Sequence, residues 1–115
     1  MKEVEIDETI RRDPKLYSAV EHATTLLEEE IGPSSGSVSA EWREFGADQR
    51  IPAIRLKISD WTGSAMIHFQ RSMLENLSDP ALRLSFVRLW GDLLQERSHK
   101  QVESLNKMIE SMTDE

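Results

Sequence analysis

Residues 54–69 constrain the fold most, because apolar and polar side chains alternate on both sides of a short turn at residues 60–63. The alternating apolar residues are Ile54, Leu56 and Ile58 before the turn, and Ala65, Ile67 and Phe69 after it. A period of two on each side predicts a β-hairpin with one buried face. Pairing Ser59 with Ser64 places all six side chains on one face, whereas a slip of one residue would expose half of them. We therefore predict a hairpin loop of two or four residues.

A third strand is predicted over residues 37–45, where apolar side chains again alternate. Its apolar residues are Val38, Ala40 and Trp42. We predict a register in which Trp42 lies opposite Ile54 and Ala40 opposite Leu56. The same register places Glu41 opposite Arg55 on the reverse face, which is a favourable cross-strand pair. The sequence thus predicts a three-stranded antiparallel meander, with the strand that follows the loop beginning at Ile51–Pro52.

A helix is predicted to precede the meander. Asp13 is a good N-cap and Pro14 suits the first helical position, where its missing N–H costs nothing. Gly32–Pro33 ends the helix, since glycine adopts the left-handed cap conformation readily. The last turn carries Glu28 to Glu30, although a helix C-terminus disfavours acids. We interpret these glutamates as a solvated cluster, with a site for a basic partner or a cation as the alternative.

Helices are also predicted after the hairpin. Ser72 and Glu75 have the spacing of a capping box, which indicates a short helix, and Asp79–Pro80 starts another. Residues 97–101 are polar, and apolar spacing then resumes at Val102, Leu105, Met108, Ile109 and Met112. One unbroken helix over residues 80–112 would be about 50 Å long. The helix must therefore break near residue 99 and fold back, or project and need a partner.

Together these elements predict an α+β two-layer sandwich with an N-terminal helix, a three-stranded meander and C-terminal helices. Residues 1–12 form an acidic tail or an edge strand, and we prefer the tail. Residues 13–98 form a single domain, and residues 99–115 an amphipathic helical extension. Self-association through residues 102–112 is the simplest way to cover the apolar stripe, because twofold dimers are the commonest oligomers. We expect a homodimer.

The composition excludes several classes of chemistry. The 115-residue chain has no cysteine, so it has no thiolate nucleophile and no Cys-based zinc site. The three histidines, at positions 22, 68 and 99, have no metal-binding spacing, and no phosphate-binding loop or nucleophile motif occurs. We predict no cofactor and no catalysis; a small enzyme using His68 is a lesser alternative. No apolar run is long enough to span a bilayer and no signal peptide is evident, so we expect a cytoplasmic protein.

The reverse face of the predicted sheet is the candidate binding surface, because it mixes apolar and charged side chains. The candidate partner-binding residues on this face are Arg43, Phe45, Arg55, Lys57, Met66 and His68, and Trp61 at the hairpin tip is a further candidate. The same face also carries Glu41, Ile51 and Ala53. Two alternatives stay open: the C-terminal helices cover part of this face, or they leave it exposed. For Trp61 we prefer packing against the domain over an exposed anchor for a partner.

The predicted function is a small acidic interaction or regulatory module that binds another protein. The alternative is nucleic-acid binding through Arg43, Arg50, Arg55, Lys57 and Arg71. A net charge of −7 disfavours it, because affinity for phosphates comes mainly from clustered cations. The element order is similar to that of double-stranded RNA-binding domains, yet residues 80–84, which open the last long helix, are largely apolar where that family has a basic cluster.

Overall fold

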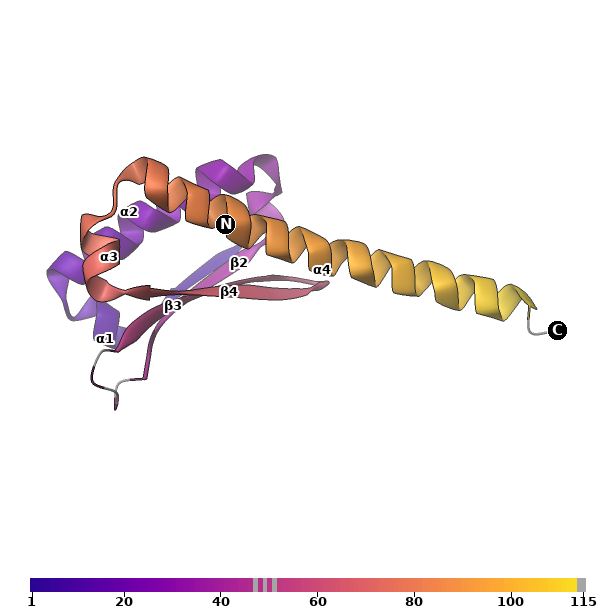
Figure 1. Cartoon of the computed structure of the whole chain (residues 1–115), viewed down its shortest axis with the longest axis horizontal. Helices are drawn as coiled ribbons and strands as arrows, with labels where there is room; N and C mark the ends of the chain where they lie inside the picture. Colours follow the sequence, from indigo (N-terminus) through magenta and orange to yellow (C-terminus); the bar gives the residue numbers. More distant parts are fainter. Residues whose placement is uncertain (47, 49, 51, 114–115) are drawn as a thin grey trace.

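The computed structural model describes residues 1–46, 48, 50 and 52–113. It confirms the predicted α+β class: helices cover one face of a sheet whose strand order is β1-β2-β3-β4 (Figure 1). The elements are β1 (Glu3–Ile6), α1 (Glu8–Arg11), α2 (Pro14–Ile31), the 3₁₀ helix η1 (Gly32–Ser37), β2 (Ser39–Phe45), β3 (Ala53–Asp60), β4 (Gly63–Gln70), α3 (Arg71–Asn76) and α4 (Asp79–Thr113). The predicted start at Ile51 lies outside the described residues.

The central hairpin has the predicted register. Ser59 lies opposite Ser64 and Leu56 opposite Ile67, and only Trp61 and Thr62 separate the two strands. Asp60 fixes the turn, since its Oδ1 accepts hydrogen bonds from the Thr62 backbone N–H (2.8 Å) and from the Thr62 hydroxyl (2.5 Å). The alternation and the turn residues, which are both local signals, are therefore sufficient to specify this hairpin.

The predicted register between β2 and β3 is wrong by two residues. Trp42 lies opposite Leu56 rather than Ile54, and Glu41 lies opposite Lys57 rather than Arg55. A shift of two residues leaves every side chain on its original face, so alternation alone does not distinguish the two registers. Trp42 still faces the core and is fully buried.

Of the two alternatives predicted for residues 1–12, the preferred tail is wrong and the edge strand is present, because β1 lies at the edge of the sheet. Strand β1 pairs in parallel with β2. The backbone N–H of Lys2, just before β1, donates to the Val38 carbonyl, and that of Asp7, just after β1, donates to the Trp42 carbonyl, both at 2.9 Å. Ile10, in α1, is fully buried. The acidic side chains Glu3 and Glu5 stay exposed, so the charge of this segment lies on the outside of a structured element.

Helix α2 has the predicted caps. Asp13 Oδ1 accepts from the Leu16 backbone N–H at 3.2 Å, and Gly32 has a φ of 70°. The glutamates of the last turn are not a separate solvated cluster, because other elements neutralise them. The N-terminal amino group lies 3.2 Å from Glu28, and Arg83 of α4 lies 3.0 Å from Glu30 and also binds Glu29.

The predicted capping box at the start of α3 is wrong. This helix begins at Arg71, so Ser72 lies inside it, and the N-cap residue Gln70 makes no side-chain cap. Glu75 instead accepts from Arg71 at 2.9 Å and lies 3.4 Å from Lys15 of α2. The carboxylate therefore joins α3 to α2 rather than capping its own helix.

Candidate functional site

Helix α4 is unbroken over 35 residues and carries the first candidate surface. It packs on α2 and β4 with its N-terminal half, then continues straight past the sheet (Figure 1). The long axis of the molecule measures 62 Å against 32 and 22 Å for the other two, because of this projection. The break near residue 99 that would fold the C-terminal segment back onto the domain does not occur.

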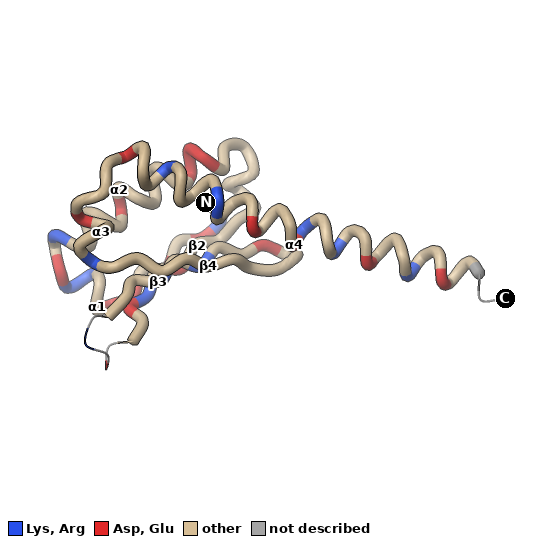
Figure 2. Tube along the Cα trace, viewed as in Figure 1, with Lys and Arg blue, Asp and Glu red and all other residues tan. Residues whose placement is uncertain are grey.

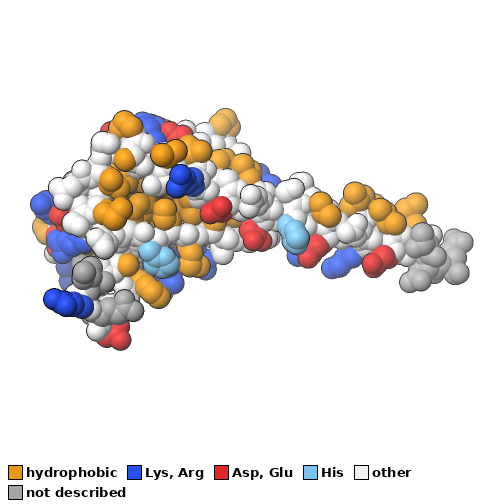
Figure 3. Space-filling view, viewed as in Figure 1, with side chains coloured by type: hydrophobic (Ala, Val, Ile, Leu, Met, Phe, Trp, Pro, Cys, Tyr) orange, Lys and Arg blue, Asp and Glu red, His pale blue; other side chains and the backbone are white. Residues whose placement is uncertain are grey.

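The five residues predicted for self-association all lie on the projecting part of α4. Their exposed fractions are 53% for Val102, 56% for Leu105, 62% for Met108, 51% for Ile109 and 76% for Met112. Apolar side chains gather along one side of this segment, and charged ones lie along the other (Figure 3). A helix with this distribution presents one apolar stripe, which its own domain does not cover.

A partly buried ion pair fixes the point at which α4 leaves the domain. Arg97 donates to Asp60 Oδ2 at 2.8 Å, and the Asp60 side chain is fully buried at the end of the β3–β4 hairpin. The Arg97 guanidinium also lies 5.4 Å from the centre of the Trp90 ring. The projecting segment therefore starts from a fixed position and direction.

The pKa of Asp60 lies below its usual range. Burial on its own would raise this pKa, but the hydrogen bonds from Thr62 and from Arg97 stabilise the carboxylate and outweigh burial. Sequence reasoning assigned Asp60 to the turn and missed Arg97. These residues are 37 positions apart, and no periodic pattern links them.

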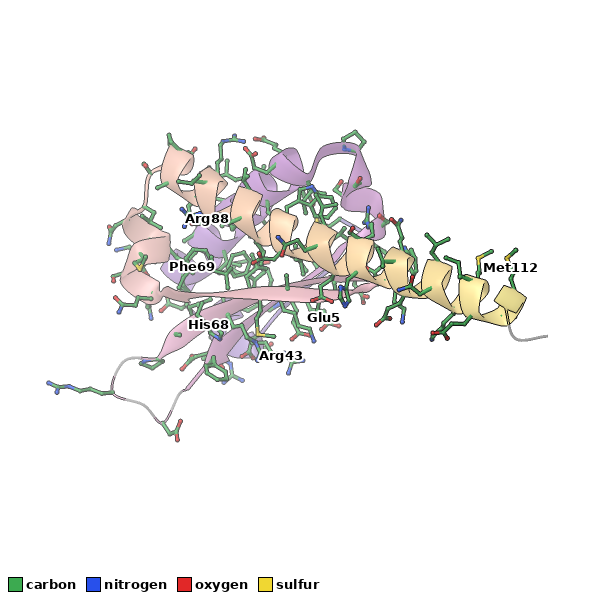
Figure 4. The ribbon with its side chains drawn as sticks, turned by 45° about the vertical axis from the view of Figure 1, so that its right-hand side comes forward. Glu5, Arg43, His68, Phe69, Arg88 and Met112 are labelled. Carbon is green, nitrogen blue, oxygen red and sulfur yellow. The ribbon has the colours of Figure 1, made fainter. Side chains whose placement is uncertain are left out.

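The second candidate surface is the face of the sheet opposite the helices, which we call the open face. Figure 4 shows His68 and Arg43 on this side of the sheet and Phe69 on the other. The Phe45 and His68 rings lie 5.1 Å apart, and the Arg55 guanidinium lies 5.5 Å from the Phe45 ring centre. The helices lie on the opposite face of the sheet and do not cover this one (Figure 1). All six sheet residues predicted for partner binding lie on the open face.

Carboxylates offset part of the positive charge of the open face. Glu41 Oε1 lies 3.0 Å from Arg43 and 3.8 Å from Arg55, and Lys57 lies opposite Glu41 in the register. Figure 2 shows acidic residues among the basic ones along the sheet. Arg71 lies elsewhere, on α3, where it binds Asp13 and Glu75. The residues predicted for nucleic-acid binding thus do not form one unpaired basic cluster.

Trp61 is separate from the rest of the predicted partner-binding set. It lies at the hairpin tip, 74% exposed, so the prediction that it packs against the domain is wrong. Phe45 pairs with Ala53 at the far end of β3, about seven residues or ~23 Å from the tip. Trp61 lines a surface hollow of about 490 Å³ together with Lys2, Ser37 and Asp60.

The described part of the chain shows little that is typical of a catalytic or metal centre. Within it, no three His, Cys, Asp or Glu side chains gather as metal ligands would. His22 binds Asp79 at 2.8 Å on the surface, and His68 packs on Phe45. None of the described helices combines the length and the apolar character needed to cross a bilayer. Compared with protein-family models, curated proteins and solved structures, the chain matches none.

Proposed function

We propose that the protein is a small interaction module that self-associates through the C-terminal part of α4 and binds another protein through the open face of its sheet, without catalysis. The observation that carries this proposal is the exposed apolar stripe on a helix that leaves its domain. A helical segment of about 15 residues is marginal in water unless its apolar face is packed. A second protein surface supplies that packing.

The open face supports the second part of the proposal. Phe45 and Met66 are 46% and 49% exposed, the Arg55 guanidinium lies against the Phe45 ring, and Lys57 lies opposite Met66 in the register. Exposed aromatic, methionine and arginine side chains are enriched at protein interfaces, where an apolar centre lies inside a polar rim. With α4 engaged in self-association, this face stays accessible to another protein.

Sedimentation of the full chain over a range of concentrations tests the self-association. The intact protein should sediment as a dimer at high concentration. Leu105→Asp should sediment as a monomer, because it places a charge in the apolar stripe. Ser104→Asp adds the same charge at the neighbouring position, on the polar side of the helix, and should leave the dimer intact. A monomeric intact chain at every concentration would contradict the proposal.

Capture of partner proteins by the immobilised full chain tests the open face. Arg55→Glu with Lys57→Glu should abolish capture while the domain stays folded by circular dichroism. The matched control is Lys2→Glu with Arg12→Glu, which makes the same charge change at two exposed side chains outside the sheet. Capture that survives the first pair of substitutions, or is lost equally with the control pair, would exclude the open face as the binding surface.

A further inference from the structure

The outer side of α4 is apolar along the domain as well as beyond it. Leu84, Val87 and Leu94 are 58%, 49% and 39% exposed, although they lie on the half of the helix that packs against the protein. The face of α4 that contacts the core is a different one, made of Leu82, Phe86, Leu89 and Leu93, which are at most 2% exposed. Helix α4 therefore has two apolar faces along the domain, and one of them is directed outward.

The outward face and the C-terminal stripe are one continuous surface. At about 100° per residue, the following positions fall within about 80° of the helix circumference. They are Leu84, Val87, Gly91, Leu94, Ser98, Val102, Leu105, Ile109 and Met112, which we call the α4 stripe. Beyond the domain, the face that would continue the core-facing residues is polar, with Lys100, Glu103 and Lys107. The projecting segment thus continues the outer face of α4 and not its buried face.

The α4 stripe is symmetric about its centre. From Leu84 to Ser98 the steps are 3, 4, 3 and 4 residues, and from Ser98 to Met112 they are 4, 3, 4 and 3 residues. An antiparallel pair of such helices, related by a twofold axis at Ser98, places each stripe residue opposite a stripe residue of the other copy. A closed twofold interface requires a surface that is complementary to itself, and this spacing provides it.

We propose that α4 pairs with α4 of a second copy in this antiparallel arrangement, so that the projecting segment of each copy covers Leu84, Val87, Gly91 and Leu94 of the other. The inference rests on the proposed self-association and adds the surface that receives the C-terminal segment. Leu84 faces Met112, Val87 faces Ile109 and Leu94 faces Val102 of the second copy. Both apolar surfaces that α4 exposes are then covered by one contact.

Gly91 has the role of a receiving site in this pairing. A glycine inside a helix costs about 1 kcal/mol relative to alanine. Apart from its two chain neighbours and the adjacent backbone of α4, no described atom lies within 4 Å of the position that a Cβ would occupy at Gly91. The monomer therefore gives no packing reason for a glycine here. In the antiparallel pair, Leu105 of the second copy lies opposite Gly91, where the missing side chain leaves room for the leucine.

Residues beside the α4 stripe are complementary in the same arrangement. On one flank, Met108 of one copy lies within about one turn of Trp90 of the other, and a thioether beside an aromatic ring is a favourable contact. On the other flank, Arg88 lies within about one turn of Glu110 of the other copy, with opposite charges. A parallel pair would instead align Gly91 with Gly91 and leave a gap between the two helices.

Single-cysteine variants of the full chain test the arrangement directly, because the chain has no cysteine of its own. Ser98→Cys should form a disulfide-linked dimer on mild oxidation. Leu105→Cys should not link to itself, since the two cysteines would be about 21 Å apart along the axis, well beyond the reach of a disulfide. A mixture of Gly91→Cys and Leu105→Cys chains should give the mixed disulfide. Glu103→Cys, on the polar side of the helix, is the control that stays unlinked.

The outcomes separate this arrangement from the proposed self-association. A dimer in which Leu105→Cys links to itself as readily as Ser98→Cys is parallel, which overturns the antiparallel arrangement and leaves self-association standing. A dimer in which neither Ser98→Cys nor the mixed pair forms a disulfide overturns the α4 pairing in the same way. A chain that is monomeric at every concentration, including one that binds a helix of a different protein, overturns both.

A second variant reports on the receiving site without cysteine chemistry. Gly91→Gln should weaken the dimer at least tenfold in sedimentation, because the glutamine side chain fills the space that Leu105 of the other copy needs. The same substitution should not destabilise the monomer, since glutamine is a better helix former than glycine and no neighbour lies within 4 Å of the position of its Cβ. An unchanged dimerisation constant would overturn the role of Gly91.

Discussion

Trp42 shows how a single polar atom connects the two layers of the molecule. The side chain is fully buried, and its indole N–H donates to the Thr24 hydroxyl of α2 at 3.0 Å. Thr24 in turn donates to the Val20 carbonyl at 2.7 Å. A buried indole N–H needs an acceptor, so the hydroxyl fixes how α2 lies across β2.

Replacing Thr24 with valine should lower the free energy of unfolding by about 1–3 kcal/mol, because the shape is kept but the Trp42 N–H loses its acceptor. Urea denaturation followed by tryptophan fluorescence measures this change. Thr25→Val makes the same chemical change one position along, at an exposed residue, and should alter stability by less than about 0.5 kcal/mol. Equal effects of the two substitutions would show that the buried hydrogen bond is not responsible.

The lowered pKa of Asp60 makes the stability of the fold depend on pH. Because hydrogen bonds from Thr62 and Arg97 hold its folded pKa below the usual range, its carboxylate contributes stability above the unfolded pKa of about 3.9. That contribution is lost as the pH falls through the lower, folded pKa. Asp60→Asn should therefore cost about 1–3 kcal/mol at pH 7, with a loss that shrinks below pH 4.

Urea unfolding at several pH values between 2 and 7 measures this dependence. The control is Asp79→Asn, which removes a carboxylate that is 53% exposed and bound only to His22 among the described residues. This control should leave the acid limb of the stability curve nearly unchanged. If Asp60→Asn keeps the same pH dependence as the native chain, the carboxylate of Asp60 does not contribute to it.

The sequence predicts some elements better than others. It predicts well those elements that depend on residues close together in the chain, and poorly those that depend on residues far apart. The β3–β4 hairpin and the two ends of α2 depend on neighbouring residues, so alternation and capping predict them. The β2–β3 register and the parallel pairing of β1 depend on contacts between distant segments. The acidic residues Glu3 and Glu5 favour a tail for residues 1–12. Composition does not show that the backbone at Val4 and Ile6 has β2 to pair with.

The candidate site follows the same division. The alternation placed six predicted residues on one sheet face, and helical spacing identified residues 102–112 as one stripe. The predicted partner-binding set joins Trp61 to the sheet residues, although Trp61 lies at the other end of β3. The exposure of Leu84, Val87 and Leu94 could not be predicted, because spacing does not show which side of a helix its domain leaves uncovered.

Ile10 tests whether the N-terminal elements contribute to the fold. Its side chain is fully buried in the core, so Ile10→Ala should lower the free energy of unfolding by about 2–5 kcal/mol. Thermal and urea unfolding of the full chain measure the loss. Thr9→Ala, at the exposed neighbouring position, should change stability far less. A disordered tail would instead give no loss for either substitution.

At the scale of the whole molecule, the projection of α4 links stability to association. Residues 98–112 are all exposed, so the apolar stripe of this segment is not packed against the domain. Any contact that buries the stripe should therefore hold the last turns of α4 in helical form. We expect the C-terminal segment of α4 to become more stably helical as the dimer forms.

Trypsin cleavage after Lys100 and Lys107 should therefore slow as the protein concentration rises, because pairing buries the C-terminal segment by mass action. Mass spectrometry at a fixed trypsin concentration gives the first-order rate for each site. Cleavage after Arg50, an exposed residue between β2 and β3, is the internal reference and should not depend on concentration. Leu105→Asp should remove the dependence at both lysines and keep their rates at the fast, dilute value. Equal rates at Lys100 and Lys107 across a hundredfold range of native protein concentration would mean that the stripe of α4 orders without a second copy.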